Sequence, residues 1–245
     1  MKRFPLISAI ALAGSLLAFA AMPQPKPDDA ANLAAVLKKM DTAAASFRST
    51  QAEFEWDKYE KVIDEVDDVQ TGTIYCRHTG KEIEMMADIK MAGSDSKNLK
   101  PERKYVLFSE GKIRMYQPKP DQVMVYDLGK KRADFESYVV LGFGGSGQDL
   151  QKAFEVTYVA PEMISGIATA KLQLIPKSDK VRNTYKQIFL WIDLDKGISV
   201  QQQFLTPQGD YRLTKYSSIR MNEKIAEDVF KLKTTGKTQT IMPNG

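Results

Sequence analysis

The chain has 245 residues, of which 43% are hydrophobic, with 35 Lys and Arg against 31 Asp and Glu. This balance is that of an ordinary globular protein and excludes collagen-like, disordered and coiled-coil chains. A single cysteine and a single histidine, His78, exclude a disulfide framework and a Cys/His zinc cluster, so most catalytic classes are disfavoured at the outset.

The N-terminus predicts a cleaved signal peptide. Lys2 and Arg3 precede an uncharged apolar stretch at 6–19, and Ala18-Phe19-Ala20 has the pattern of a cleavage site. The stretch is short for a membrane span, and a Pro-rich polar run follows it.

We therefore expect residues 1–20 to be removed, residues 21–28 to form a Pro-rich leader, and residues 29–245 to form one domain outside the cytoplasm. Removal of the two basic residues leaves a net charge of +2. That charge is too small to indicate nucleic-acid binding.

The first element of the mature domain is a predicted helix at 29–48. Asp28 and Asp29 are residues that favour a helix start, and apolar residues then recur every three or four positions. We expect the helix to end near Ser49-Thr50, where the period changes. The apolar stripe consists of Leu33, Val36, Leu37, Met40, Ala44 and Phe47.

From residue 51 the apolar residues alternate with polar ones, as in Ala52, Phe54 and Trp56, which is typical of strands with one wet face. Turn signals separate about eleven such runs. Residues 91–103 are polar and predict a long loop, and residues 133–153 predict a loop followed by a short helix.

A sheet of this size implies spare internal room. About eight strands enclose an interior that side chains just fill, so a curled sheet of eleven strands must hold helices or a ligand. Two interpretations stay open: the inward residues form a plain core sealed by the helix, or they line a cavity. Cys76 is predicted to be a buried small hydrophobe in either case.

The sequence contains short matches to catalytic and nucleotide-binding motifs, but the elements that such motifs require around them are not predicted. Residues 142–147 match the G-x-G-x-x-G spacing, but alternating strands follow, which favours a loop between the sheet and the lid. No glycine lies five residues before a Gly-Lys pair, so there is no Walker loop. Glu53/Glu55 and Glu82/Glu84 fall on the polar face of strands. We expect no catalytic residues, no metal and no cofactor.

A set of segments after the helix has a recognisable order and spacing. In chain order they are Ala52-Glu53-Phe54, Gly72 to Arg77, Ser109 to Pro118, Ala170 to Pro176, Tyr185 to Asp193 with the turn at 195–197, and Val229 to Leu232 as the last strand. The most specific part is a Ser-acid-Gly-Lys turn that precedes an aromatic strand and a Pro turn. With these segments, the sequence resembles the outer-membrane lipoprotein carrier (LolA) family over nearly all of residues 29–242.

The resemblance implies an unclosed, strongly curved antiparallel β-barrel with a helical lid on its concave apolar face. Family members are periplasmic carriers that take acylated lipoproteins from an inner-membrane ATP-driven release complex and pass them to an outer-membrane receptor. The same cargo and partners are implied here, for a monomer that binds no nucleic acid.

The family also has an Arg at the end of its second strand that hydrogen-bonds the lid. This position maps to Arg77, with His78 as an alternative one residue on. The family's Arg is commonly followed by Pro, whereas His78-Thr79-Gly80 follows here.

The sequence thus predicts a non-enzymatic carrier whose inward residues hold acyl chains. The strand parity of this set is fixed by alternation at 54/56, 83/85 and 172 and is a guess elsewhere. The predicted lipid-binding residues are Leu33, Leu37, Met40, Phe54, Trp56, Ile83, Met85, Ile113, Met115, Val123, Leu172 and Leu190.

Two other functions were compared with this one. The same half-barrel could sense mislocalised lipoproteins and bind an anti-sigma partner, or carry another envelope lipid; a second domain would favour the sensor, and the sequence shows no boundary for one. A hydrolase acting on envelope lipids ranks last, because no nucleophile and base form a pair.

Overall fold

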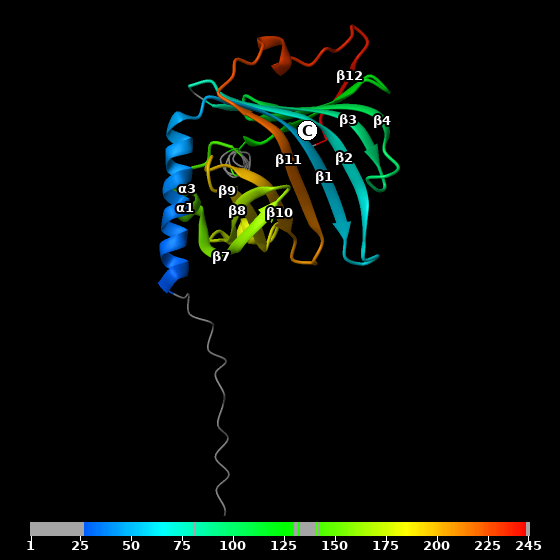
Figure 1. Cartoon of the computed structure of the whole chain (residues 1–245). Coiled ribbons are helices and arrows are strands. Elements are labelled where there is room, and N and C mark those ends of the chain that lie inside the picture. The colour runs from blue at the N-terminus through cyan, green and yellow to red at the C-terminus, as the bar shows by residue number, and fades with distance from the viewer. Residues whose placement is uncertain (1–26, 81, 130–131, 133–140, 142, 244–245) are drawn as a thin grey trace, which may run out of the picture.

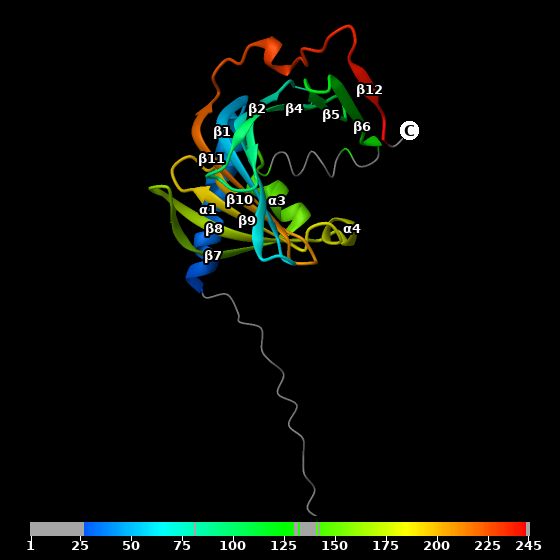
Figure 2. The ribbon, with the colours of Figure 1, turned by 90° about the vertical axis from the view of Figure 1, so that its right-hand side faces the viewer.

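The computed structural model describes residues 27–80, 82–129, 132, 141 and 143–243. The strands form one continuous sheet that curls strongly around its concave face without closing, with helices against that face (Figures 1 and 2). The predicted open antiparallel β-barrel with a helical lid is therefore confirmed. The predicted signal peptide lies outside the described residues.

The sheet has twelve strands. They are β1 (Ser49–Glu60), β2 (Glu65–His78), β3 (Ile83–Gly93), β4 (Lys100–Ser109), β5 (Lys112–Gln117), β6 (Gln122–Asp127), β7 (Phe154–Ile164), β8 (Ile167–Pro176), β9 (Gln187–Asp193), β10 (Ser199–Leu205), β11 (Tyr211–Met221) and β12 (Gln239–Ile241). The described helical elements are α1 (Pro27–Ser46), α3 (Gly147–Ala153), α4 (Asp179–Arg182) and the 3-10 turn η2 (Glu227–Phe230). Across the described residues, no helix has both the length and the apolar character needed to span a membrane.

The strand order is β12-β6-β5-β4-β3-β2-β1-β11-β10-β9-β8-β7. Consecutive strands pair as antiparallel neighbours within β1–β6 and within β7–β11, and the pairing of β1 with β11 joins these two groups. β12 adds to β6 in the parallel sense and accounts for the strand beyond the predicted eleven. The edges at β12 and β7 stay apart, so the barrel is open.

The helix at the N-terminus ends three residues earlier than the apolar period predicts. α1 stops at Ser46, whose hydroxyl donates to the carbonyl oxygen of Ala43 at 3.2 Å. The backbone N–H of Arg48 then donates to the side-chain oxygen of Asn222 at 2.8 Å, which directs the chain into β1. A tertiary hydrogen bond therefore decides this boundary.

Two other sequence predictions were wrong. The loop predicted at 91–103 is mostly strand, because β3 continues to Gly93 and pairs with β4 through a register shift between Ile89 and Met91 that hides the alternation. The last strand predicted at 229–232 is instead the end of η2 and an extended segment. That segment packs its apolar residues on the sheet without a strand partner, which alternation cannot distinguish from a strand.

The C-terminal segment, residues 222–243, crosses the convex face and ends beside β6 (Figure 2). Phe230 packs there with Met86 and Leu107. The Thr238 hydroxyl donates to the carboxylate of Asp121 at 2.6 Å, which fixes the far end of the segment. The convex face therefore has its own small apolar cluster, separate from the concave core.

Candidate functional site

The concave face is mostly apolar, and two different sets of residues cover its two halves. We define the sealed half as the concave side of β7–β10 together with α1, α3 and the residue Leu141. Its buried side chains are at most 6% exposed. They are Val36, Leu37, Met40, Leu141, Leu150, Phe154, Ala170, Leu172, Leu174, Ile188, Leu190 and Ile192.

Two glycines allow α1 to lie close to its neighbours in the sealed half. A Cβ on Gly147 would stand 2.7 Å from the carbonyl oxygen of Leu37, and a Cβ on Gly197 would stand 2.5 Å from that of Lys39. The backbone N–H of Gln148 also donates to the Asp41 carboxylate at 3.1 Å, which joins α3 to α1. The lid helix is therefore firmly seated over these strands.

We define the open half as the concave side of β1–β6 and β11. A cavity of about 490 Å³ lies between this surface and the edge of the sealed half. The size falls within the range of roughly 300–1,000 Å³ that is usual for small-ligand sites. The cavity is lined by Trp56, Ile74, Cys76, Met85, Phe143, Thr184, Tyr185, Gln202, Phe204, Arg212, Thr214 and Tyr216.

The stretch between β6 and α3 reaches both halves. Leu141 belongs to the core of the sealed half, whereas Phe143 packs in the open half with its ring 4.8 Å from that of Tyr216. Gly144 has a φ of +87°, and a Cβ there would lie 2.6 Å from the Phe47 ring, so glycine suits this bend. Phe143 thus forms one wall of the cavity.

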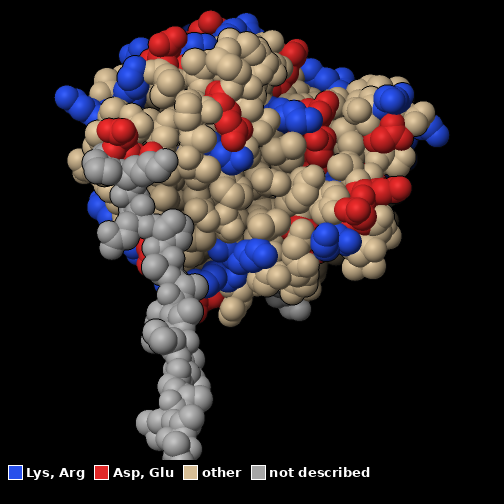
Figure 3. Space-filling model, turned by 60° about the horizontal axis from the view of Figure 1, so that its bottom comes forward, with Lys and Arg blue, Asp and Glu red and all other residues tan. Residues whose placement is uncertain are grey.

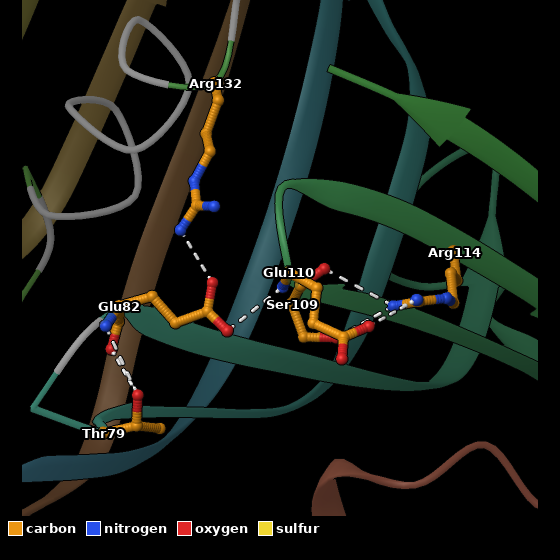
Figure 4. Close-up of polar contacts among 6 residues, drawn as sticks. All are labelled: Thr79, Glu82, Ser109, Glu110, Arg114 and Arg132. Carbon is orange, nitrogen blue, oxygen red and sulfur yellow. Dashed lines mark hydrogen bonds and ion pairs between the residues drawn. The ribbon is translucent and has the colours of Figure 1, made fainter. Parts of the chain in front are cut away.

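Polar contacts tie the start of this stretch to the sheet (Figure 4). Arg132 donates to Glu82 at 2.7 Å, and the other carboxylate oxygen of Glu82 accepts from the backbone N–H of Glu110 at 3.3 Å. Arg114 pairs with Glu110 at 2.9 Å and also donates to the Ser109 hydroxyl at 2.9 Å. This network joins the turn after β2, the turn after β4 and the stretch that follows β6.

Burial keeps two titratable groups of the cavity wall, Cys76 and Tyr216, neutral. Burial raises the pKa of the Cys76 thiol to about 12, and the same desolvation raises the pKa of Tyr216 above its usual range. Cys76 is free and buried, as the sequence predicted. A thiol in this state is a poor nucleophile, because the thiolate is the reactive form. The wall therefore offers binding surface rather than an activated group.

One end of the cavity is polar. Gln202 and Thr214 are buried neighbours on β10 and β11, and Arg212 is exposed two residues from Thr214 on the same face. The hairpin turns of β1–β2 and β10–β11 lie together beyond this point, since the backbone N–H of Lys61 donates to Asp210 at 2.9 Å. Figure 3 views this end of the barrel, where uncharged residues fill the middle and charges of both signs surround them.

The structure separates the predicted lipid-binding residues into groups. Trp56 and Met85 border the cavity, and Phe54 stacks on Trp56 with ring centroids 4.2 Å apart. Strand pairing places Ile83, Ile113 and Met115 on the same face, farther from the cavity. The remaining members on the concave side belong to the sealed half: Leu33, Leu37, Met40, Leu172 and Leu190.

Val123 lies apart from all of these residues. It pairs with Tyr116, which pairs with Tyr105, and this row belongs to the convex face. Successive residues of a strand face opposite sides of the sheet, so an assignment that is wrong by one residue exchanges the two faces. The sequence-based assignment of β6 was wrong by one residue. Met124, which pairs with Met115, holds the concave position instead.

Arg77 also points to the convex face. Its guanidinium contacts Glu84 at 2.7 Å and Glu227 at 2.6 Å, and it lies 4.2 Å from the centre of the Phe230 ring. These contacts bind the C-terminal segment to β2 and β3. The predicted role of Arg77 as a latch for the helical lid stays a prediction, as does the His78 alternative.

Several cavity residues were not predicted from the sequence. Tyr216, Thr214 and Arg212 alternate along β11, and this period of two could have marked a strand face. Gln202 and Phe143 carried no such signal, because the first is polar on an inward position and the second lies in a glycine-rich stretch. Within the described residues, no three His, Cys, Asp or Glu side chains gather as metal ligands would.

Comparisons with known proteins support the fold. No protein-family model and none of the curated proteins matches the sequence. Among solved structures, an uncharacterized conserved protein from Thermus thermophilus is similar, with a TM-score of 0.52 at 9% identity over 86% of this chain and 99% of that one. MucB is similar with a TM-score of 0.51 at 14% identity over 86% of this chain.

The chain spans 66% of the length of that MucB structure, just under two thirds. A LolA superfamily protein from Nitrosomonas europaea also matches, with a TM-score of 0.39 at 12% identity over 82% of this chain and 97% of that one. The likeness to the Thermus thermophilus protein and to MucB is a likeness of fold.

Proposed function

We propose that this protein is a periplasmic carrier that binds the acyl chains of lipoproteins in the concave cavity and moves them from the inner to the outer membrane. The observation that carries the proposal is the cavity of about 490 Å³ in the open half. Trp56, Met85 and Phe143 give it an apolar wall beside a seated lid. The open barrel with a helical lid, which is the fold that the resemblance to the carrier family implies, supports the proposal.

The energetics of transfer suit such a cavity. Each methylene group removed from water is worth about 0.8 kcal/mol, so ten of them contribute roughly 8 kcal/mol. An acyl chain therefore cannot cross the periplasm unaided. It can move between apolar sites that bury a similar area of its surface. Methionine adapts to irregular apolar shapes, which suits a wall that accepts chains of different length.

The two tryptophans of the chain allow a direct test. Trp56 borders the cavity, whereas Trp191 pairs with Gln201 and packs against Lys171 on the convex face. In the variant Trp191→Phe, we expect a dipalmitoylated peptide to shift the remaining emission from Trp56. In Trp56→Phe, the emission of Trp191 should stay constant on addition of the same peptide.

A third variant measures affinity. Trp56→Glu places a charge in the apolar wall and should abolish binding of the peptide while far-UV circular dichroism stays unchanged. Carriage itself is measured by transfer of a labelled lipopeptide from donor to acceptor vesicles. An unchanged affinity in Trp56→Glu would contradict the cavity assignment.

A second candidate is a lipoprotein sensor that retains its ligand and contacts a regulatory partner. The fold likeness to MucB favours it, and a solved Pseudomonas aeruginosa structure shows MucB in complex with MucA. The vesicle experiment separates the two functions. A carrier accelerates transfer between vesicles, whereas a sensor binds the lipopeptide and does not release it.

A further inference from the structure

The cavity contains one polar group that the fold leaves without a partner. Gln202 lies on β10, lines the cavity and is 4% exposed. Within the described part of the chain, its amide nitrogen Nε2 is buried and has no hydrogen-bond partner. Buried polar groups in native proteins are nearly always hydrogen-bonded, so a lone amide on a cavity wall calls for a ligand or an ordered water.

Gln202 and its neighbour Thr214 lie between two apolar residues. Strand pairing sets Trp56, Thr214, Gln202 and Leu190 side by side in one row across β1, β11, β10 and β9. Leu190 is fully buried in the sealed half, and Trp56 borders the cavity. Gln202 and Thr214 therefore form a polar point within an apolar wall, at the boundary between the two halves.

The rim beyond this point is also polar. Arg212 precedes Thr214 by two residues along β11 and thus lies on the same face, where it pairs with Phe204 on β10 and Lys58 on β1. Lys58 is itself bound by the carboxylates of Glu60 and Asp67. The wall is thus apolar at Trp56, hydrogen-bonding at Gln202 and Thr214, and charged at Arg212. An amphiphile has its hydrocarbon tail, linking group and head group in the same order.

We propose that Gln202, with Thr214, hydrogen-bonds the carbonyl oxygen of a bound acyl group, whether ester or amide. This rests on the proposed function and adds the chemical feature that the cavity selects. The amide N–H of Gln202 and the hydroxyl of Thr214 are donors, and an acyl carbonyl is an acceptor that cannot donate. The hydrocarbon tail then lies along Trp56 and Met85, and the head group leaves past Arg212.

The consequence is discrimination between acyl and alkyl chains of equal length. An alkyl ligand would fill the same apolar volume but would leave the Gln202 amide unpaired in a buried place. A site built to hydrogen-bond a ligand group rejects the analogue without it. We expect about a tenfold difference in affinity, which is the size of one net hydrogen bond.

The test is displacement of the apolar dye 1-N-phenylnaphthylamine from the mature protein. Methyl hexadecanoate and hexadecyl methyl ether serve as competitors, because they differ in the carbonyl group. The ester should displace the dye at about tenfold lower concentration than the ether. In Gln202→Met, which keeps the side-chain length, ester affinity should fall to that of the ether, and ether affinity should not fall.

A neighbouring glutamine supplies the matched control. Gln203 is half-buried on the opposite face of β10, where it pairs with Phe189 and Leu213, so Gln203→Met should keep the ester preference. If Gln202→Met does not fold, Thr214→Val serves as the test variant. It removes the hydroxyl donor and should reduce the preference for the ester over the ether.

The outcomes separate this inference from the proposed function. Equal displacement by ester and ether from the unmodified protein would overturn the role of Gln202 and leave acyl-chain binding in place. Failure of both competitors to displace the dye, or of the dye to bind, would instead count against the cavity as a lipid site. An ester preference that survives in Gln202→Met would assign carbonyl recognition to another group and overturn the inference.

Discussion

The sealed half and the open half of the concave face are built by the same alternation but completed differently. In the sealed half, branched aliphatic residues such as Leu172, Ile188 and Leu190 are fully buried beneath α1. In the open half, the longer side chains of Trp56 and Met85 are half-buried and border a cavity. Strand pattern alone therefore does not decide whether an apolar face becomes core or binding surface.

The difference arises from how far the lid reaches. α1 is a single helix of 20 residues and packs along one side of the curled sheet, as Figure 2 shows. In the open half, Phe143 packs against the concave face. One half is thus fully packed, whereas the other keeps a cavity.

The largest expected effect is on the free energy of unfolding, which we compare between the sealed half and the open half. Leu190→Ala should reduce the free energy of unfolding by about 2–5 kcal/mol, because the surrounding core cannot close over the lost volume. Met85→Ala removes a side chain that already borders empty space, and it should cost less than about 2 kcal/mol. Urea unfolding of both variants gives the comparison. Equal losses would show that the open half is packed as tightly as the sealed one.

The second expected effect is on the reactivity of the Cys76 thiol, which reports how easily a reagent reaches the wall of the cavity. Burial raises the pKa of its thiol from 9.0 to about 12, so at pH 8 its thiolate should be about a thousandfold rarer than that of an unperturbed thiol. Labelling by iodoacetamide should be correspondingly slow in the folded protein and fast in urea. Fast labelling of the folded protein would mean that water and reagent reach the cavity wall freely.

The same shift predicts a pH dependence of stability. The unfolded chain loses the thiol proton near pH 9, whereas the folded protein keeps it to about pH 12. The unfolded state therefore binds fewer protons between these values, and stability should fall as the pH rises through this window. Cys76→Ala should remove this part of the slope, which is measured by urea midpoints from pH 8 to pH 10.

A smaller effect is expected where the lid meets the sealed half. Gly147→Ala places a Cβ 2.7 Å from the Leu37 carbonyl oxygen, so α3 must move away from α1, at a cost of about 1–3 kcal/mol. Gly236→Ala is the matched control, because nothing lies within 4 Å of its added Cβ. Thermal unfolding of the two variants gives the measurement. If both are neutral, α1 is seated less tightly than this contact indicates.

The smallest expected effect concerns the convex face. Arg77→Met removes the contacts with Glu84, Glu227 and Phe230, so the C-terminal segment should exchange its amide hydrogens faster while α1 does not change. Arg103→Met, which removes an exposed pair with Asp88, is the control. Hydrogen exchange resolves the two segments. Faster exchange in α1 itself would support the latch role that the family resemblance implies for Arg77.

Much of the fold could be predicted because it depends on local periodicity. The stripe of Leu33, Leu37 and Met40 marked the helix, and the alternation around Phe54 and Trp56 marked strand faces correctly. The wrong strand predictions lie where a register shift interrupts the alternation, or where alternating residues pack on the sheet without pairing with a strand. The register shift after Ile89 hid the end of β3, and the apolar residues at 229–232 pack on the convex face without joining the sheet.

The sequence by itself determined that one apolar face of a large antiparallel sheet had to be covered, and that one helix was available to cover it. Only the tertiary structure decided which strands that helix covers, that Cys76, Gln202 and Tyr216 meet around the uncovered part, and that Val123 and Arg77 face outward. The physical reason is that alternation fixes the spacing of side chains along a strand. Their neighbours across the sheet depend on register and curvature, which no single strand encodes.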